Sequence, residues 1–129
     1  MAVFKDTAQM YEVLGGLWKQ LIEHPENGQK FKESGLTVKY NLSDPEGTLW
    51  VTPDGVFTGN QDLKADVEMT LSGDTAHKFW LKELTLPAAL ARRLIVSKGP
   101  MSKVMKLLPL LKPLHDLYPT VCEKYNLPR

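Results

Sequence analysis

Residues 84–115 read LTLPAALARRLIVSKGPMSKVMKLLPLLKPLH, and this stretch says most about the fold of the 129-residue chain. It contains six basic residues and no acidic one, and it is rich in leucine and methionine. A helix that is apolar on most sides has to be covered by protein, lipid or a ligand. Prolines at 109 and 113 predict an interrupted helix, because proline removes a helical hydrogen bond and clashes with the preceding turn. A broken, apolar and basic segment suggests a cavity for apolar molecules near a membrane surface.

An amphipathic helix is expected at the other end of the chain, over residues 7–23. Asp6 can cap this helix, with Gln9 three residues further on as in a capping box. Pro25 should end it, because proline keeps the preceding residue out of the helical conformation. A shorter helical turn then leads to a stop at Gly35.

Alternating apolar and polar residues predict strands in the middle of the chain, over residues 36–42, 48–52, 56–58 and 67–71. After an N-cap at Ser72 or Asp74 the pattern becomes helical. A short helix is expected next, then a last strand, then the C-terminal helical segment, over residues 88–93, 94–97 and from 101 onward. This order predicts the α+β class, a single domain with mainly antiparallel strands and helices covering one sheet face.

Composition excludes several classes of protein. The net charge of +1 gives no overall attraction to nucleic acid, and the basic residues alternate with aliphatic side chains and not with aromatic ones that stack on bases. The single cysteine, Cys122, rules out an internal disulfide and is expected as a small packing group. No apolar run approaches a membrane span, and neither a secretory nor a peroxisomal signal is seen. We therefore expect a soluble, cytoplasmic protein.

The sequence contains no recognisable catalytic constellation. The three histidines share no metal-ligand spacing, and the nucleophile elbow, phosphate loop and dinucleotide fingerprint are all missing. His77 is interpreted as part of a capped first helical turn, and His115 as a surface or helix-end residue. We therefore predict no catalytic residue, metal or cofactor, while an enzyme that uses either histidine remains the alternative.

The last third of the chain allows two interpretations. A helix packed on a sheet buries a stripe of little more than 100°, but Leu107, Leu108, Leu110 and Leu111 cover more than that. The excess of apolar residues indicates either a fully buried C-terminal helix or a ligand cavity.

Four features follow one another along nearly the whole chain. They are the first helix ending at His24-Pro25, Trp50-Val51 before Pro53-Asp54-Gly55-Val56, the strand 66–71 leading into Ser72-Gly73-Asp74 with Phe79 and Leu84, and the closing segments 95–99 and 105–108. Because these features occur in this order, the chain resembles the sterol carrier protein 2 domain, a family of non-specific lipid-transfer domains. The resemblance implies a five-stranded sheet, an apolar tunnel between sheet and helices, and binding of fatty acids, acyl-CoA, phospholipids or sterols without chemistry.

The sequence departs from that family at two points. Residues 84–87 replace a small-residue loop with glycine, which predicts a different tunnel mouth. The resemblance places residues 101–117 along the tunnel as a lid, and Pro109 and Pro113 predict that this lid breaks near Leu108, with residues 110–117 the more mobile half.

The expected site combines apolar and basic residues. The predicted lipid-binding residues are Leu14, Leu17, Trp18, Leu21, Phe79, Trp80, Leu84, Leu90, Leu94, Met101, Met105, Leu108, Leu111 and Leu114. The predicted head-group or membrane contacts are Arg92, Arg93, Lys98, Lys103 and Lys106. The expected partners are an apolar lipid and, transiently, an anionic membrane, for a monomer or weak dimer. The alternative is a protein-interaction or dimerisation module that uses the same apolar C-terminal surface.

Overall fold

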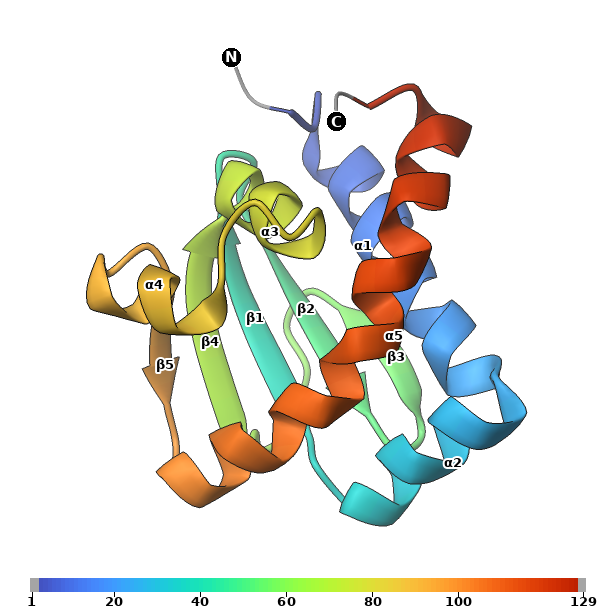
Figure 1. Ribbon diagram of the computed structural model, residues 1–129, viewed down its shortest axis with the longest axis vertical. Coiled ribbons are helices and arrows are strands. Elements are labelled where there is room, and N and C mark those ends of the chain that lie inside the picture. Colours follow the sequence, from blue (N-terminus) through green and yellow to red (C-terminus); the bar gives the residue numbers. More distant parts are fainter. Residues whose placement is uncertain (1–2, 128–129) are drawn as a thin grey trace.

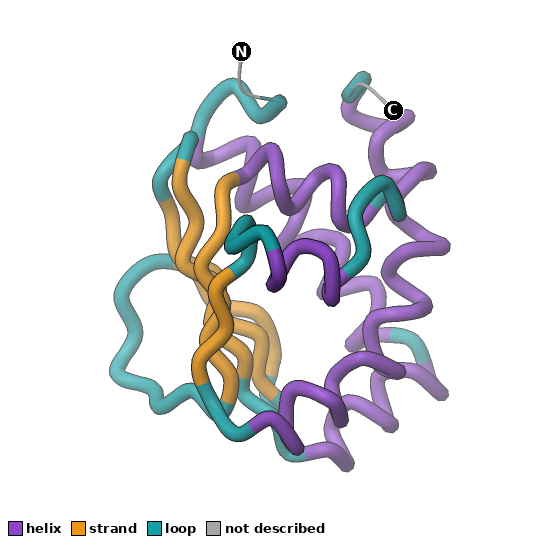
Figure 2. Tube along the Cα trace, turned by 60° about the vertical axis from the view of Figure 1, so that its left-hand side comes forward, coloured by secondary structure: helices purple, strands orange, loops and turns teal. Residues whose placement is uncertain are grey.

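The structure, a computed structural model, describes residues 3–127 and consists of a five-stranded sheet with helices over one of its faces (Figures 1 and 2). In chain order the elements are α1 (Thr7–Glu23), α2 (Pro25–Ser34), β1 (Val38–Ser43), β2 (Gly47–Thr52), β3 (Gly55–Thr58), β4 (Val67–Ser72), α3 (Gly73–Trp80), α4 (Leu86–Ala91), β5 (Val96–Lys98) and α5 (Met101–Tyr125). The predicted α+β class is confirmed.

The sheet is mixed, with strand order β3-β2-β1-β4-β5. The β1–β2, β2–β3 and β4–β5 pairs are antiparallel, as expected. The central β1–β4 pair is parallel, with Leu42 opposite Leu71. The chain reaches this register through the loop of residues 59–66, which lies on the side of the sheet away from the helices (Figure 2). The expectation of a mainly antiparallel sheet is therefore confirmed, and the parallel pair at its centre was not predicted.

Strand alternation directs one set of side chains towards the helices. Val38, Tyr40 and Leu42 of β1 are buried, while the residues between them are half-buried. Trp50 points to the opposite face of the sheet, yet it is also buried, with only 4% of its surface exposed. Its indole Nε1 donates to the Gly59 carbonyl at 3.0 Å. The loop that follows β3 therefore covers this tryptophan on the outer face of the sheet.

Local signals set the boundaries of the first two helices. Asp6 caps α1, since its Oδ1 accepts from the Gln9 amide at 2.8 Å. His24 ends α1 and caps α2, because its Nδ1 accepts from the amides of Glu26 and Asn27. Gly35 ends α2 in the left-handed conformation at φ 67°, which glycine adopts without strain. The predicted cap at Asp6, the helix end before Pro25 and the stop at Gly35 are confirmed, while the capping of α2 by His24 was not predicted.

The prediction that the C-terminal segment breaks near Leu108 is wrong. α5 is one helix of 25 residues with Pro109, Pro113 and Pro119 inside it. It buries seven residues at spacings of one, three or four: Val104, Leu107, Leu111, Leu114, Tyr118, Val121 and Cys122. Burial of that stripe outweighs the roughly 3 kcal/mol that a proline costs in a helix interior. The axis of α5 curves as it crosses the helical layer (Figure 1). The greater mobility predicted for residues 110–117 stays a prediction.

The helices of residues 3–127 differ from a membrane span in length or in hydropathy. None of them is both long enough and apolar enough to cross a bilayer.

Candidate functional site

An enclosed apolar cavity lies between the sheet and the helices. Its volume is about 20 Å³, roughly the space that one buried water needs. Side chains from the first, second and fourth strands, from helices α1, α3, α4 and α5, and from the residue just before β5 form its wall: Leu14, Trp18, Tyr40, Leu42, Leu49, Met69, Leu71, Ala76, Phe79, Trp80, Leu86, Ile95 and Leu111. The space between the two layers is therefore nearly filled by its own lining, and the open tunnel expected there stays a prediction.

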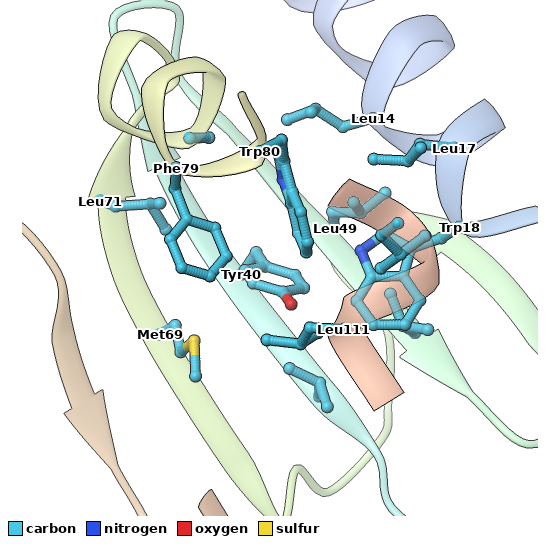
Figure 3. Packing of buried hydrophobic residues seen from close by; sticks show 14 of the residues in the cluster. Leu14, Leu17, Trp18, Tyr40, Leu49, Met69, Leu71, Phe79, Trp80 and Leu111 are labelled. Carbon is cyan, nitrogen blue, oxygen red and sulfur yellow. The ribbon is translucent and has the colours of Figure 1, made fainter. Parts of the chain in front are cut away.

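Aromatic rings occupy the middle of this lining (Figure 3). The rings of Trp18 and Trp80 meet edge to face, with centroids 6.1 Å apart. Phe79 packs on Trp80 at 4.9 Å, and Tyr40 lies 6.1 Å from Trp18. Aromatic pairs of this kind contribute about 0.5–1.5 kcal/mol each beyond their buried area. A ligand would have to replace these contacts with its own.

A groove of about 340 Å³ opens to solvent beside the cavity, between α3, α4 and α5. Its lining shares Phe79, Leu86 and Leu111 with the cavity. Ordinary ligand pockets measure about 300–1,000 Å³, so the groove has the size of one. The three shared side chains border both spaces, so their displacement would join the groove and the cavity into a single pocket.

His115 lies in this groove, although the sequence indicated a surface or helix-end position. Its Nδ1 is 3.3 Å from the Trp80 carbonyl oxygen, and its ring packs against Phe79 and Trp80 at 5.0 and 5.3 Å. Burial lowers the pKa of His115, and the nearby Lys82 lowers it further, while the Trp80 carbonyl and Asp116 oppose the shift. The imidazole is therefore held towards its neutral form.

His77 is a core residue, which the interpretation as part of a capped first turn missed. It is 4% exposed, and its Nδ1 lies 2.7 Å from the hydroxyl of Tyr118 on α5. Burial raises the pKa of Tyr118, so the phenol stays protonated. The pair joins α3 to α5 outside the cavity lining.

The structure divides the predicted lipid-binding residues into groups. Five line the cavity, namely Leu14, Trp18, Phe79, Trp80 and Leu111. Leu84 and Leu108 line the groove beside it. Leu17, Leu21 and Leu114 are buried in the core outside the cavity lining, and Leu90 lines a separate groove near β5. The binding role of each stays a prediction.

Three of the predicted residues are exposed and line neither the cavity nor the groove beside it. Leu94, Met101 and Met105 are 41, 63 and 57% exposed. α5 buries the face that carries Val104, Leu107 and Leu111, and this leaves both methionines on the solvent side. The prediction that these three residues lie in a tunnel wall is therefore wrong for this structure.

The structure also places the predicted basic residues in different surroundings. Lys103 forms an ion pair with Asp66 at 2.8 Å, which lowers the pKa of that carboxyl chiefly through the hydrogen bond. Lys106 donates to the Ser34 carbonyl at 3.1 Å. Arg92, Arg93 and Lys98 are exposed, and no salt bridge within residues 3–127 involves them.

Sequence reasoning missed most of the wall that the sheet contributes. Tyr40, Leu42, Leu49, Met69 and Leu71 all face the cavity. Their alternation with polar residues was visible and predicted a buried strand face. The pattern did not reveal that this face borders a cavity and not only closely packed core.

No protein-family model matches the sequence, and no curated protein matches it significantly. Solved structures do match. The sterol carrier protein domain 2 of Helicoverpa armigera has a TM-score of 0.71 at 17% identity, over 83% of this chain and 89% of that one. Sterol carrier protein 2 from Yarrowia lipolytica, in its apo form, has a TM-score of 0.61 at 14% identity, over 79% of this chain and 89% of that one. The chain therefore has the sterol carrier protein 2 fold.

The same fold also occurs as part of a larger protein. The sec-alkylsulfatase Pisa1 from Pseudomonas sp. matches with a TM-score of 0.52 at 21% identity, over 64% of this chain but only 14% of that one. A protein described as the ubiquinone synthesis protein UbiJ-SCP2 matches over 84% of this chain and 93% of its own length, with a TM-score of 0.61 at 13% identity. At these identities the likeness concerns the fold alone, and function has to be argued from the site.

Proposed function

We propose that this protein binds one apolar lipid between its sheet and its helices and carries it through water. The observation that carries the proposal is the enclosed apolar cavity, together with the groove that three side chains separate from it. Two of the similar structures are sterol carrier proteins by name, which supports lipid as the ligand class. Fatty acids, acyl-CoA, phospholipids and sterols are the candidates.

The energetics favour an apolar chain. Burial of one methylene is worth about 0.8 kcal/mol, so ten methylenes supply about 8 kcal/mol before the costs of association. Part of that energy has to displace Phe79, Leu86 and Leu111, since the closed cavity holds about 20 Å³. Because apolar contacts dominate the lining, selectivity for chain length and unsaturation should be broad.

We further propose that the role is non-catalytic. General acid–base catalysis needs a positioned pair of titratable groups. Tyr40 contributes the one titratable side chain of the cavity lining, and burial raises the pKa of its hydroxyl well above the usual range. These features support binding as the role of the cavity.

Displacement of a fluorescent fatty acid tests the carrier function. Trp18 and Trp80 line the cavity and should transfer excitation energy to a bound fluorophore. We expect saturable 1:1 binding that oleate reverses. Leu111→Phe, which fills the cavity, should weaken binding at least tenfold, whereas Leu110→Phe on the same helix should not. Absence of saturable binding to the wild-type protein would disprove the carrier function.

We also propose that the protein loads and unloads its lipid at an anionic membrane, through an exposed surface formed by α4, β5 and the start of α5. Leu94, Val96, Met101 and Met105 are four of the six exposed large apolar side chains in residues 3–127. Arg92, Arg93 and Lys98 lie among them in the sequence and are exposed as well. Each basic residue near such a membrane contributes about 1 kcal/mol, so charge complementarity favours an anionic bilayer as the partner.

Vesicle flotation tests this contact. We expect binding to vesicles that contain phosphatidylglycerol and little binding to pure phosphatidylcholine. The double variant Met101→Ser/Met105→Ser should lose most of the binding, and Leu63→Ser, which removes an exposed leucine from the loop after β3, should keep it. No vesicle binding, together with self-association that the methionine variant abolishes in sedimentation velocity, would favour the interaction module instead.

A further inference from the structure

Tyr40 places a polar group inside the apolar cavity. The residue lies on β1 and is 7% exposed. Its hydroxyl oxygen points away from the strand, into the space between Trp80 and Leu111 (Figure 3). Within residues 3–127 this hydroxyl makes no hydrogen bond, and burial is the sole cause of its raised pKa.

Two further donors belong to the same lining. The indole N–H groups of Trp18 and Trp80 also make no hydrogen bond to any residue that the structure describes. Trp50, on the outer face of the sheet, does have a partner, the Gly59 carbonyl. Within residues 3–127, Ser97 Oγ is the one fully buried side-chain polar atom without a partner, so the three donors of the lining keep access to open space. They are available to an acceptor that the chain itself does not supply.

The chemistry of the lining limits what that acceptor can be. Apart from these donors the side chains of the wall are aliphatic, thioether or phenyl groups, and none of them carries a charge. An ionised carboxylate or phosphate would lose its hydration without gaining a cation, which is strongly unfavourable. A neutral oxygen does not carry this desolvation penalty. Because the Tyr40 phenol stays protonated, it can donate to such an oxygen throughout the physiological pH range.

We propose that Tyr40 is a ligand-binding residue that donates a hydrogen bond to a neutral hydroxyl or carbonyl oxygen on the buried part of the lipid. The inference rests on the proposed carrier function and narrows its ligand class. The cavity takes a hydrocarbon chain or ring system with an uncharged oxygen, such as a fatty alcohol, a sterol-like alcohol, a ketone or an ester. A charged head group remains in the groove or in solvent.

A thermodynamic cycle between protein and ligand tests this assignment. The affinities of dodecan-1-ol and dodecane are measured by displacement of one fluorescent probe from the wild-type protein and from Tyr40→Phe. We expect the variant to bind the alcohol about five- to tenfold more weakly, the usual worth of one hydrogen bond. Dodecane binding should change less than twofold. An equal change for both ligands, or no change for either, overturns the role of Tyr40.

Two controls separate this role from a structural one. Tyr11→Phe removes a hydroxyl that accepts from the Thr48 amide outside the cavity, and it should leave the ratio of the two affinities unchanged. The carbonyl stretching frequency of bound dodecan-2-one should lie lower in the wild-type protein than in Tyr40→Phe, and equal frequencies contradict the hydrogen bond. If the fluorescent probe does not bind the wild-type protein at all, the carrier function fails, and this inference fails with it. If the probe binds but neither dodecane nor dodecan-1-ol displaces it, the inference about Tyr40 alone fails.

Discussion

The buried pair of His77 and Tyr118 shows how single polar contacts hold the helical layer together. Its members come from α3 and α5, and 2.7 Å separates the imidazole Nδ1 from the phenol oxygen. Tyr118→Phe keeps the ring but deprives His77 of this partner. A buried group that loses a hydrogen bond costs about 1–3 kcal/mol, so we expect a decrease of that size in the free energy of unfolding, measured with urea. A change below about 0.5 kcal/mol would contradict the importance of the pair.

His115 should make stability depend on pH. Its pKa in the folded protein is lowered, chiefly by burial, so the unfolded chain binds more protons between the two pKa values. The stabilisation is therefore complete above the ordinary value near 6.5 and is lost as the pH falls towards the folded value. We expect the free energy of unfolding of the wild-type protein to fall more steeply from pH 7 to 5 than that of His115→Gln. Parallel curves would show that the imidazole is not desolvated.

At the scale of elements, α5 is stabilised by its packing against α1 and α2 and not by its own propensity. Pro109 is exposed on this helix. Pro109→Ala restores a backbone donor and removes a clash worth about 3 kcal/mol, while the unfolded chain gains up to about 1 kcal/mol of flexibility. We expect a net stabilisation of about 2 kcal/mol with unchanged helix content by circular dichroism. A loss of stability would mean that the curvature of α5 depends on this proline and is needed for packing.

The same elements show what the sequence could predict. Caps and stops such as Asp6, His24-Pro25 and Gly35 act within a few residues, so their outcome is local and was predictable. The parallel pairing of β1 with β4 and the continuity of α5 depend on distant contacts. Rules for proline in isolated helices do not include that packing. For the same reason the sequence could place Met101 and Met105 on one helix face but not decide whether that face is buried.

At the scale of the whole molecule, the site is a closed cavity with a groove beside it, and Leu111 belongs to both. Leu111→Ala should cost about 2–5 kcal/mol in unfolding free energy, because it leaves a hole in a packed interior. The same change should connect the cavity to the groove. We therefore expect faster association of a fluorescent fatty acid in stopped-flow measurements. Unchanged association would show that a ligand enters elsewhere.

The central claim is that the space between sheet and helices accepts a lipid. Native mass spectrometry of the delipidated protein, mixed with one equivalent each of oleate, oleyl alcohol and cholesterol, tests it most directly. We expect 1:1 complexes with at least one of these lipids, and Leu111→Phe should reduce them while Leu110→Phe should not. Spectra that show only the bare protein with all three lipids would contradict the account.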